Sequence, residues 1–290
     1  KTVHKATTTA VRFQLHPAEA QVYLYETVGH TRVWPNDDGS FPLSEGFTYD
    51  CSFTKAGYIG QNGNMELTTE NGQQRLTFGT DTYTNLSAVS VTLQKAAVNS
   101  SIFELDAEWA NFRGTDSNNG ITDAKTPISA AGGMLYWASP LGKGYAGNHI
   151  YRVNKATGAI EASGDMAGTS SFAINGPTYA NGILLVGLSN GRIQAFNAKT
   201  LESLWLYTDP MGGQPNCPIT ILGDYAYTGF WNGEALGGSF VCVSLTDEDP
   251  TSTTEAKYAT WRHEQDGGFY WAGAYACNDF IMVGTDDGDA

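Results

Sequence analysis

Cysteine is the residue type of this chain with the widest chemistry, as a nucleophile, a redox group or a metal ligand. The four cysteines are Cys51, Cys217, Cys242 and Cys277, and no two of them have C-x-x-C spacing. That spacing is typical of zinc sites and of thioredoxin-like redox sites. We therefore expect buried small hydrophobic residues at these positions. A disulfide between strands stays open if the chain occupies an oxidising compartment.

Metal and catalytic motifs are not found in the sequence. The five histidines are scattered without ligand spacing: His4, His16, His30, His149 and His263. No G-x-S-x-G, H-E-x-x-H or Walker segment occurs. The segments 116–120 and 286–289 are only superficially similar to calcium loops, because neither ends in the bidentate Glu of such loops. The sequence predicts no catalytic residue, no metal and no cofactor, and it favours a non-enzymatic protein.

Stacking of aromatic rings on a ligand is the one remaining kind of site chemistry. Trp231, Tyr270 and Trp271 are candidates, because exposed aromatic rings stack on sugars. The alternative is that these three rings fill the apolar core. A glycan or a protein is therefore the expected type of partner.

Charge and composition restrict the class of protein. The 290 residues include 16 Lys and Arg against 30 Asp and Glu, a formal net charge of −14, which argues against nucleic-acid partners. The 34 glycines and 12% aromatic residues favour short strands joined by tight turns, an all-β chain. No apolar run is long enough for a transmembrane helix, and the first ten residues lack a signal-peptide core, as in a processed exported chain or an engineered one.

Residues 10–97 contain about seven short, alternating strand segments with regularly spaced turn residues, which indicates a β-sandwich. Asn36-Asp-Asp-Gly39 predicts a hairpin turn. The order of Leu15–Tyr25, this turn and Gly46–Tyr58 resembles the immunoglobulin-like or PEGA-like modules of bacterial surface proteins. The resemblance implies a spacer or adhesive module on an exported protein, at the cell surface or outside the cell.

The second region contains an internal repeat. Four segments share a Pro or Gly, a turn residue and an apolar strand that ends in a small residue: 127–138, 177–187, 218–229 and 273–284. Three of them are followed by a second strand and a turn, at 149–158, 192–200 and 239–247. Two copies then have a strand with a tryptophan, Trp205 or Trp261, where the first copy has Ala162. Four strands in a unit of this size predict a blade of a β-propeller.

This region resembles the PQQ-like repeat propellers, among them outer-membrane assembly lipoproteins. The resemblance rests on the lead-in Trp109–Gly120 and on the turn Asn197-Ala-Lys-Thr200 with Trp205. It implies a structural role for Trp205 and Trp261, in the docking of adjacent blades. The same fold includes quinone-dependent dehydrogenases, which use calcium, an Asp and adjacent cysteines, and no Cys-Cys pair occurs here. A quinoprotein oxidoreductase and a glycan-active enzyme stay open as alternatives.

The sequence therefore predicts a β-sandwich over residues 1–97, a linker over 98–108 and PQQ-like propeller blades over 109–290. We expect about three and a half four-stranded blades, and so an incomplete propeller whose remaining blades come from missing sequence or a second chain. The expected function is that of a non-catalytic, exported bacterial surface protein that uses the propeller as a binding or scaffold platform.

Overall fold

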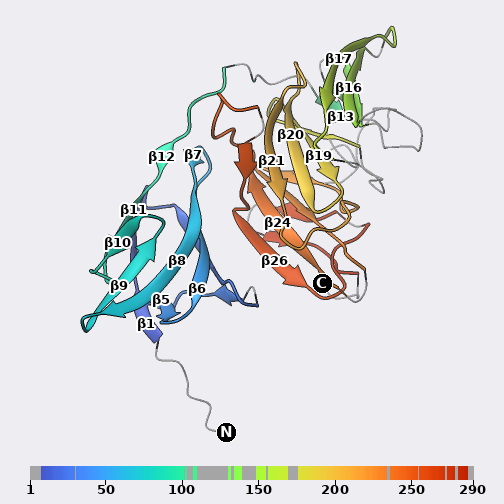
Figure 1. Cartoon of the computed structure of the whole chain (residues 1–290). Helices are drawn as coiled ribbons and strands as arrows, with labels where there is room; N and C mark the ends of the chain where they lie inside the picture. The colour runs from blue at the N-terminus through green and yellow to red at the C-terminus, as the bar shows by residue number, and fades with distance from the viewer. Residues whose placement is uncertain are drawn as a thin grey trace. The chain divides into compact units, whose positions relative to one another are not determined.

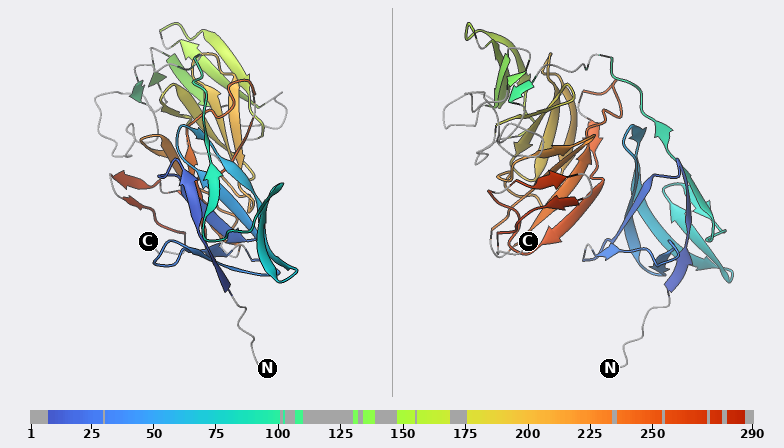
Figure 2. Two further views of the ribbon diagram at one scale, coloured as in Figure 1. Left: turned by 90° about the vertical axis from the view of Figure 1, so that its left-hand side faces the viewer. Right: turned by 180° about the vertical axis from the view of Figure 1, so that it is seen from behind.

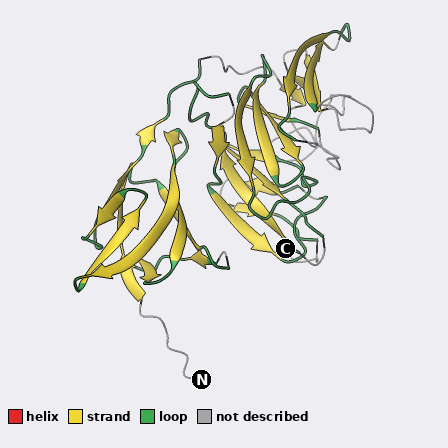
Figure 3. Ribbon diagram, viewed as in Figure 1, coloured by secondary structure: helices red, strands yellow, loops and turns green. Residues whose placement is uncertain are grey.

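The computed structural model describes residues 8–29, 31–100, 102, 107–109, 130–131, 134–138, 148–154, 156–168, 176–233, 236–253, 255–271, 273–277 and 280–286. These residues form strands and loops without a helix, so the all-β prediction is confirmed for the described part of the chain (Figure 3). They divide into two compact units, residues 1–96 and 97–290. Most of the predicted lead-in, the calcium-like segment 116–120 and His4 lie outside the described residues.

The first unit is built from twelve short strands. They are β1 (Thr8–Val11), β2 (Phe13–His16), β3 (Gln21–Glu26), β4 (Arg32–Val33), β5 (Phe41–Ser44), β6 (Thr48–Thr54), β7 (Tyr58–Ile59), β8 (Gln61–Glu70), β9 (Gln73–Phe78), β10 (Asp81–Tyr83), β11 (Val89–Thr92) and β12 (Gln94–Lys95). An antiparallel sheet has the order β10-β9-β8-β6-β3-β4, and the pairs β1–β5, β2–β11 and β7–β12 complete the unit (Figure 1).

Alternation along the strands sets the core of this unit. In β6, Tyr49, Cys51 and Phe53 are buried, and the residues between them are partly exposed. This period of two places one side of the strand in the apolar core. Asn36–Gly39 forms a turn, with the Gly39 amide donating to the Asn36 carbonyl (2.8 Å). The hairpin prediction is nevertheless wrong, because β4 before the turn pairs with β3 and β5 after it pairs with β1.

The second unit contains the remaining sixteen strands. They are β13 (Ala107–Trp109), β14 (Ala130–Ala131), β15 (Met134–Ala138), β16 (His149–Asn154), β17 (Ile160–Asp165), β18 (Thr178–Ala180), β19 (Ile183–Leu188), β20 (Arg192–Asn197), β21 (Ser203–Thr208), β22 (Thr220–Leu222), β23 (Tyr225–Gly229), β24 (Gly238–Ser244), β25 (Glu255–Lys257), β26 (Trp261–Gln265), β27 (Tyr275–Cys277) and β28 (Phe280–Met282).

Strand order in the second unit follows the sequence repeat. The four sheets have the orders β13-β14-β15-β16-β17, β18-β19-β20-β21-β25, β22-β23-β24-β26 and β27-β28. Each repeat copy supplies an antiparallel meander of neighbouring strands. One strand departs from the meander: β25 follows β24 in the chain but joins the preceding sheet, parallel to β21. The sequence repeat does not predict that β25 pairs with the preceding sheet.

Three apolar clusters lie between successive sheets. One joins β16 and β17 to the β18–β21 sheet, the next joins that sheet to β22–β24, and the third lies between β24 and the segment around β28. In β19, Leu184, Val186 and Leu188 belong to the first cluster, and Ile183 and Leu185 belong to the second. The views in Figure 1 and Figure 2 agree that successive sheets pack face to face. Each inner strand is therefore buried on both sides, with a different core on each.

The glycine that ends the apolar strand has a steric reason in two of the repeat copies. A Cβ on Gly187 would lie 2.9 Å from the Cβ of Pro215, and one on Gly229 would overlap the Cβ of Phe269. Both neighbours belong to the loop that leads to the next strand pair. A side chain at either glycine would therefore push that loop away from its sheet.

The turn after the second strand of each copy is built from side-chain caps. The Oδ1 atom of Asn197 accepts from the amides of Lys199 (2.9 Å) and Thr200 (3.3 Å). Asn154 does the same for the amides of Ala156 (3.0 Å) and Thr157 (3.2 Å). These two turns are therefore the same Asx turn, used twice.

We predict that Gly229→Ala destabilises the protein by about 1–3 kcal/mol, since overpacking displaces Phe269. The matched control is Gly284→Ala, at the corresponding place in the last repeat copy. There, no atom of the described residues lies within 4 Å of the position that a Cβ would take. Urea unfolding of both variants measures the difference. Equal midpoints for the two variants would contradict the steric argument.

Candidate functional site

The loops at one end of the second unit's sheets form a continuous border, which we call the loop edge. It comprises residues 189–191, 209–219, 230–233, 266–271 and 283–286. Antiparallel strands alternate in direction, so these connections emerge at the same end of their sheets. Loops that join rigid strands at one end are a common position for binding sites.

Backbone hydrogen bonds link each loop to the next along this edge. The donors and acceptors are Gly191 N to Gly213 O (2.8 Å), Asp209 N to Gly191 O (2.8 Å), Gln214 N to Trp231 O (2.7 Å), Phe269 N to Phe230 O (3.1 Å) and Asp286 N to Gly268 O (2.9 Å). Gln214 and Trp231 also form an isolated antiparallel bridge. The loop edge is therefore tied together by main-chain contacts that do not depend on side-chain identity.

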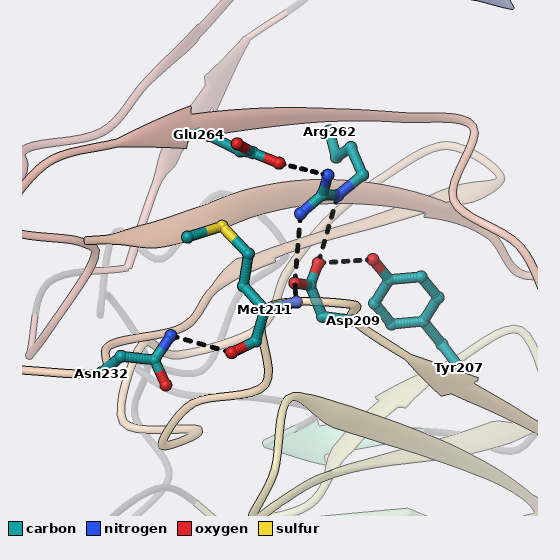
Figure 4. Close-up of polar contacts among 6 residues, drawn as sticks. All are labelled: Tyr207, Asp209, Met211, Asn232, Arg262 and Glu264. Carbon is teal, nitrogen blue, oxygen red and sulfur yellow. Dashed lines mark hydrogen bonds and ion pairs between the residues drawn. The ribbon is translucent and has the colours of Figure 1, made fainter. Parts of the chain in front are cut away.

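A buried ion pair fixes the loop that starts at residue 209. Asp209, with a fully buried side chain, is paired with Arg262 of β26, at 3.2 Å between Arg262 Nη2 and Asp209 Oδ1 (Figure 4). The Tyr207 hydroxyl donates to Asp209 Oδ2 (2.7 Å), and Arg262 Nη1 contacts Glu264 Oε1 (2.5 Å). The pair joins two sheets, because Asp209 follows β21 and Arg262 lies in β26.

Burial sets the protonation of this group. Burial and the neighbouring Asp209 carboxylate raise the pKa of Tyr207 well above its usual range, so the hydroxyl keeps its proton and remains a donor. Burial acts to lower the pKa of Arg262, but Asp209, Tyr207 and Glu264 together raise it above its usual value. The network therefore contains a permanent cation, the Arg262 guanidinium.

The ion pair positions the neighbouring loop through two further contacts. The Met211 amide donates to Asp209 Oδ1 (2.9 Å), and Asn232 Nδ2 donates to the Met211 carbonyl (3.1 Å) (Figure 4). Asn232 adjoins Trp231 in the chain. The buried Asp209–Arg262 pair thus helps to fix the position of Trp231 through Met211 and Asn232.

The three aromatic residues predicted from the sequence lie together on this edge. The ring centroids of Trp231 and Tyr270 are 4.7 Å apart, and those of Tyr270 and Trp271 are 4.4 Å apart. Trp231 and Tyr270 are partly buried, whereas Trp271 is 55% exposed. We call these three residues the aromatic patch. The sequence left open whether these rings are exposed or fill the core. In the structure, two partly buried rings support a third ring that faces solvent.

Polar contacts fix the orientation of the aromatic patch. Trp231 Nε1 donates to Asp286 Oδ2 (3.0 Å), a contact between residues far apart in the chain. Trp271 has a positive φ of 55°. A bulky non-glycine residue rarely adopts this conformation, and strained backbone of this kind clusters at ligand sites.

The two tryptophans predicted to dock blades lie within the body of the second unit. Trp205 is fully buried in the cluster shared by the β18–β21 and β22–β24 sheets. Trp261 is partly exposed and lies 6.0 Å from Tyr227 and 6.1 Å from Phe240, between ring centroids. Their role in docking blades stays a prediction.

All four cysteines are free thiols, and Cys51, Cys217 and Cys242 are buried. Burial raises the pKa of Cys51 and Cys242 to about 12 and that of Cys217 to about 11. Because the thiolate is the reactive form, these three cysteines are inert.

Sequence reasoning missed a buried lysine in β25, the strand that joins the preceding sheet. Lys257 of β25, with a side chain 1% exposed, donates to the Thr246 carbonyl (2.6 Å) and pairs with Glu248 (3.1 Å). Its ammonium lies 5.2 Å from the centroid of the Trp205 ring. Burial lowers the pKa of Lys257. No local sequence pattern predicts this site, because the site depends on the pairing of β25 with the preceding sheet.

No group of three or more metal-ligating side chains occurs within the described ranges. The described residues form no helix, and therefore no helix that could span a membrane. No family model and no curated protein matches the sequence.

Several solved structures resemble the chain. A europium-containing methanol dehydrogenase is 18% identical over 47% of this chain and 24% of its own, with a TM-score of 0.36. A quinohemoprotein alcohol dehydrogenase from Pseudomonas putida HK5 is 14% identical over 54% and 26%, with a TM-score of 0.42. BamB from Moraxella catarrhalis is 10% identical over 99% and 92%, with a TM-score of 0.38. The chain spans about a quarter of the length of the two dehydrogenases.

We predict that Arg262→Leu destabilises the protein by about 3–5 kcal/mol, because it leaves the buried Asp209 carboxylate without its cation. Glu264→Gln removes only the outer contact of Arg262 and should cost less than about 1 kcal/mol. Urea unfolding of each variant measures both effects. If Asp209→Asn combined with Arg262→Leu were no more stable than Arg262→Leu alone, the uncompensated charge would not be the cause.

We predict a pH effect at Glu255. Burial raises the pKa of Glu255 to about 6 in the folded protein. The protonated carboxyl therefore contributes stability that is present below the unfolded pKa, about 4.3, and is lost as pH rises through about 6. Glu255→Gln should gain stability relative to the wild type across this window, as measured by unfolding at a series of pH values. Parallel stability curves for the two proteins would refute the assignment.

Proposed function

We propose that the protein is a non-catalytic, exported bacterial surface protein, in which the second unit is part of a PQQ-like β-propeller that binds a partner at its loop edge. The observation that carries this proposal is the aromatic patch, in which partly buried Trp231 and Tyr270 support the exposed ring of Trp271. Large rings that are exposed and already fixed in place contact ligands with little loss of conformational freedom.

The propeller assignment is supported by the chain's own contacts. Successive antiparallel meanders share an apolar cluster at each of three boundaries. A four-stranded meander with two apolar faces is stable only between neighbours, which is the arrangement of propeller blades. The first unit, with its six-stranded sheet and separate apolar core, is consistent with an immunoglobulin-like spacer.

A binding role is favoured over catalysis by the electrostatics of the loop edge. The most buried ionisable group there, Asp209, is fully engaged by Arg262, Tyr207 and the Met211 amide. An acid or base catalyst needs a group that exchanges a proton near the working pH. The Asp209 network instead fixes a loop, as a binding platform requires.

The prediction that tests the proposal concerns Trp271. The wild type, Trp271→Ala and Phe280→Ala should be screened against one array of glycans and one library of displayed peptides and proteins. Trp271→Ala should lose the bound ligands, whereas Phe280→Ala should keep them, because Phe280 is equally exposed, at 55%, but lies at the other end of its strand from the loop edge.

Near-ultraviolet circular dichroism should show that both variants are folded. Ligands that bind the wild type and both variants equally would place the binding surface elsewhere and overturn the proposal. An absence of any ligand in both screens would also count against it.

A further inference from the structure

We propose that the ligand of the aromatic patch is a neutral glycan, one of whose pyranose rings lies on the exposed face of Trp271. This inference rests on the proposed function and names the class of ligand for the same site. The supporting observations are the geometry of the rings, the polar groups beside them and the charge of the chain.

The ring geometry leaves much of one indole ring exposed. Trp271 meets Tyr270 in an edge-to-face contact, at an interplanar angle of 75°, and the Trp271 residue remains 55% exposed. Tyr270 in turn lies 34° from the plane of Trp231. A sugar whose substituents are equatorial has a flat face of C–H groups that matches an indole in size and shape, and aromatic rings favour such apolar contact.

Polar groups with unused hydrogen-bonding capacity surround the patch. Asp286 uses Oδ2 to accept from Trp231, and its Oδ1 atom has no hydrogen-bond partner within the described ranges. Gln214, which bridges to Trp231 through the backbone, uses Oε1 to accept from Asn216, and its Nε2 donors have no partner among the same residues. A carboxylate and a primary amide together supply the acceptors and donors that adjacent sugar hydroxyls require.

Pre-organisation of the patch favours a small ligand with a rigid ring over a flexible chain. The backbone links along the loop edge and the Trp231–Asp286 contact fix the patch before a ligand arrives. A small site of this kind orients one ring with a few polar contacts. A protein partner usually needs about 800 Å² of contact on each side, far more than three aromatic residues supply.

Charge distinguishes between classes of glycan. The formal net charge is −14, and Asp286 is exposed beside the patch. Anionic sugars and nucleic acids are therefore repelled, although nucleic-acid bases also stack on aromatic rings. Neutral oligosaccharides experience no such repulsion.

The test is titration calorimetry of the full chain with cellohexaose, xylohexaose and mannohexaose, and with trigalacturonate as the anionic comparison. We expect at least one neutral sugar to bind, with little dependence on salt. Trp271→Ala should weaken that binding by about tenfold or more, and Trp271→Phe should restore part of it. Phe280→Ala is the matched control and should bind as the wild type does.

Asp286→Asn keeps an acceptor for Trp231 Nε1 and removes the negative charge. It should therefore strengthen binding of trigalacturonate relative to binding of the neutral sugar, which loses a carboxylate acceptor but gains no charge attraction. Tighter binding of trigalacturonate than of every neutral sugar by the wild type would overturn the proposal.

The outcomes separate this inference from the proposed function. If none of the neutral sugars binds while the display screen yields a protein ligand that depends on Trp271, the glycan assignment is wrong and the binding platform survives. If neither kind of ligand depends on Trp271, both proposals fail.

Discussion

The structure of the second unit depends on sheets that are apolar on both faces. Val241 and Val243 of β24 face one cluster, while Phe240 and Cys242 of the same strand face another. At about 25 cal/mol for each Å² of apolar surface, a sheet of this kind gains most of its stability from neighbours on both sides. The sheets are therefore stable only as a series, and each added sheet completes the burial of the one before it.

Buried ion pairs connect neighbouring sheets. Asp209 of the loop edge pairs with Arg262 of β26, and Lys257 of β25 pairs with Glu248, which follows β24. Both connect elements that come from different sheets, since β25 joins the sheet before it and Arg262 contacts the residue after β21. Apolar packing is non-directional, so it fixes the placement of neighbouring sheets only loosely. The directional contacts of the buried charges fix that placement further.

The sequence predicts the features of this fold that repeat, because repetition turns weak local signals into a pattern. The strand pairs, the Asn197 turn and the small residue at Gly229 all recur at corresponding positions. Features that depend on one long-range pairing were not predictable. Asp209 and Arg262 are separated by a whole sheet, and nothing in their local sequence links them. The Asn36–Gly39 turn shows the same limit, since turn residues predict a reversal of the chain but not which strands then pair.

The aromatic patch illustrates how the same packing leaves exposed the surface that we propose to bind a ligand. Trp271 can remain exposed because it does not belong to the apolar clusters between the sheets. Its support comes from Tyr270 and Trp231, and theirs from loops tied by main-chain hydrogen bonds. The entropy needed to fix these rings is therefore lost during folding, when the apolar clusters supply the driving force, and not during binding. A rigid repeat with a variable edge can in this way change its ligand by substitutions at the loops, while the alternating pattern of the strands, and with it the fold, remains the same.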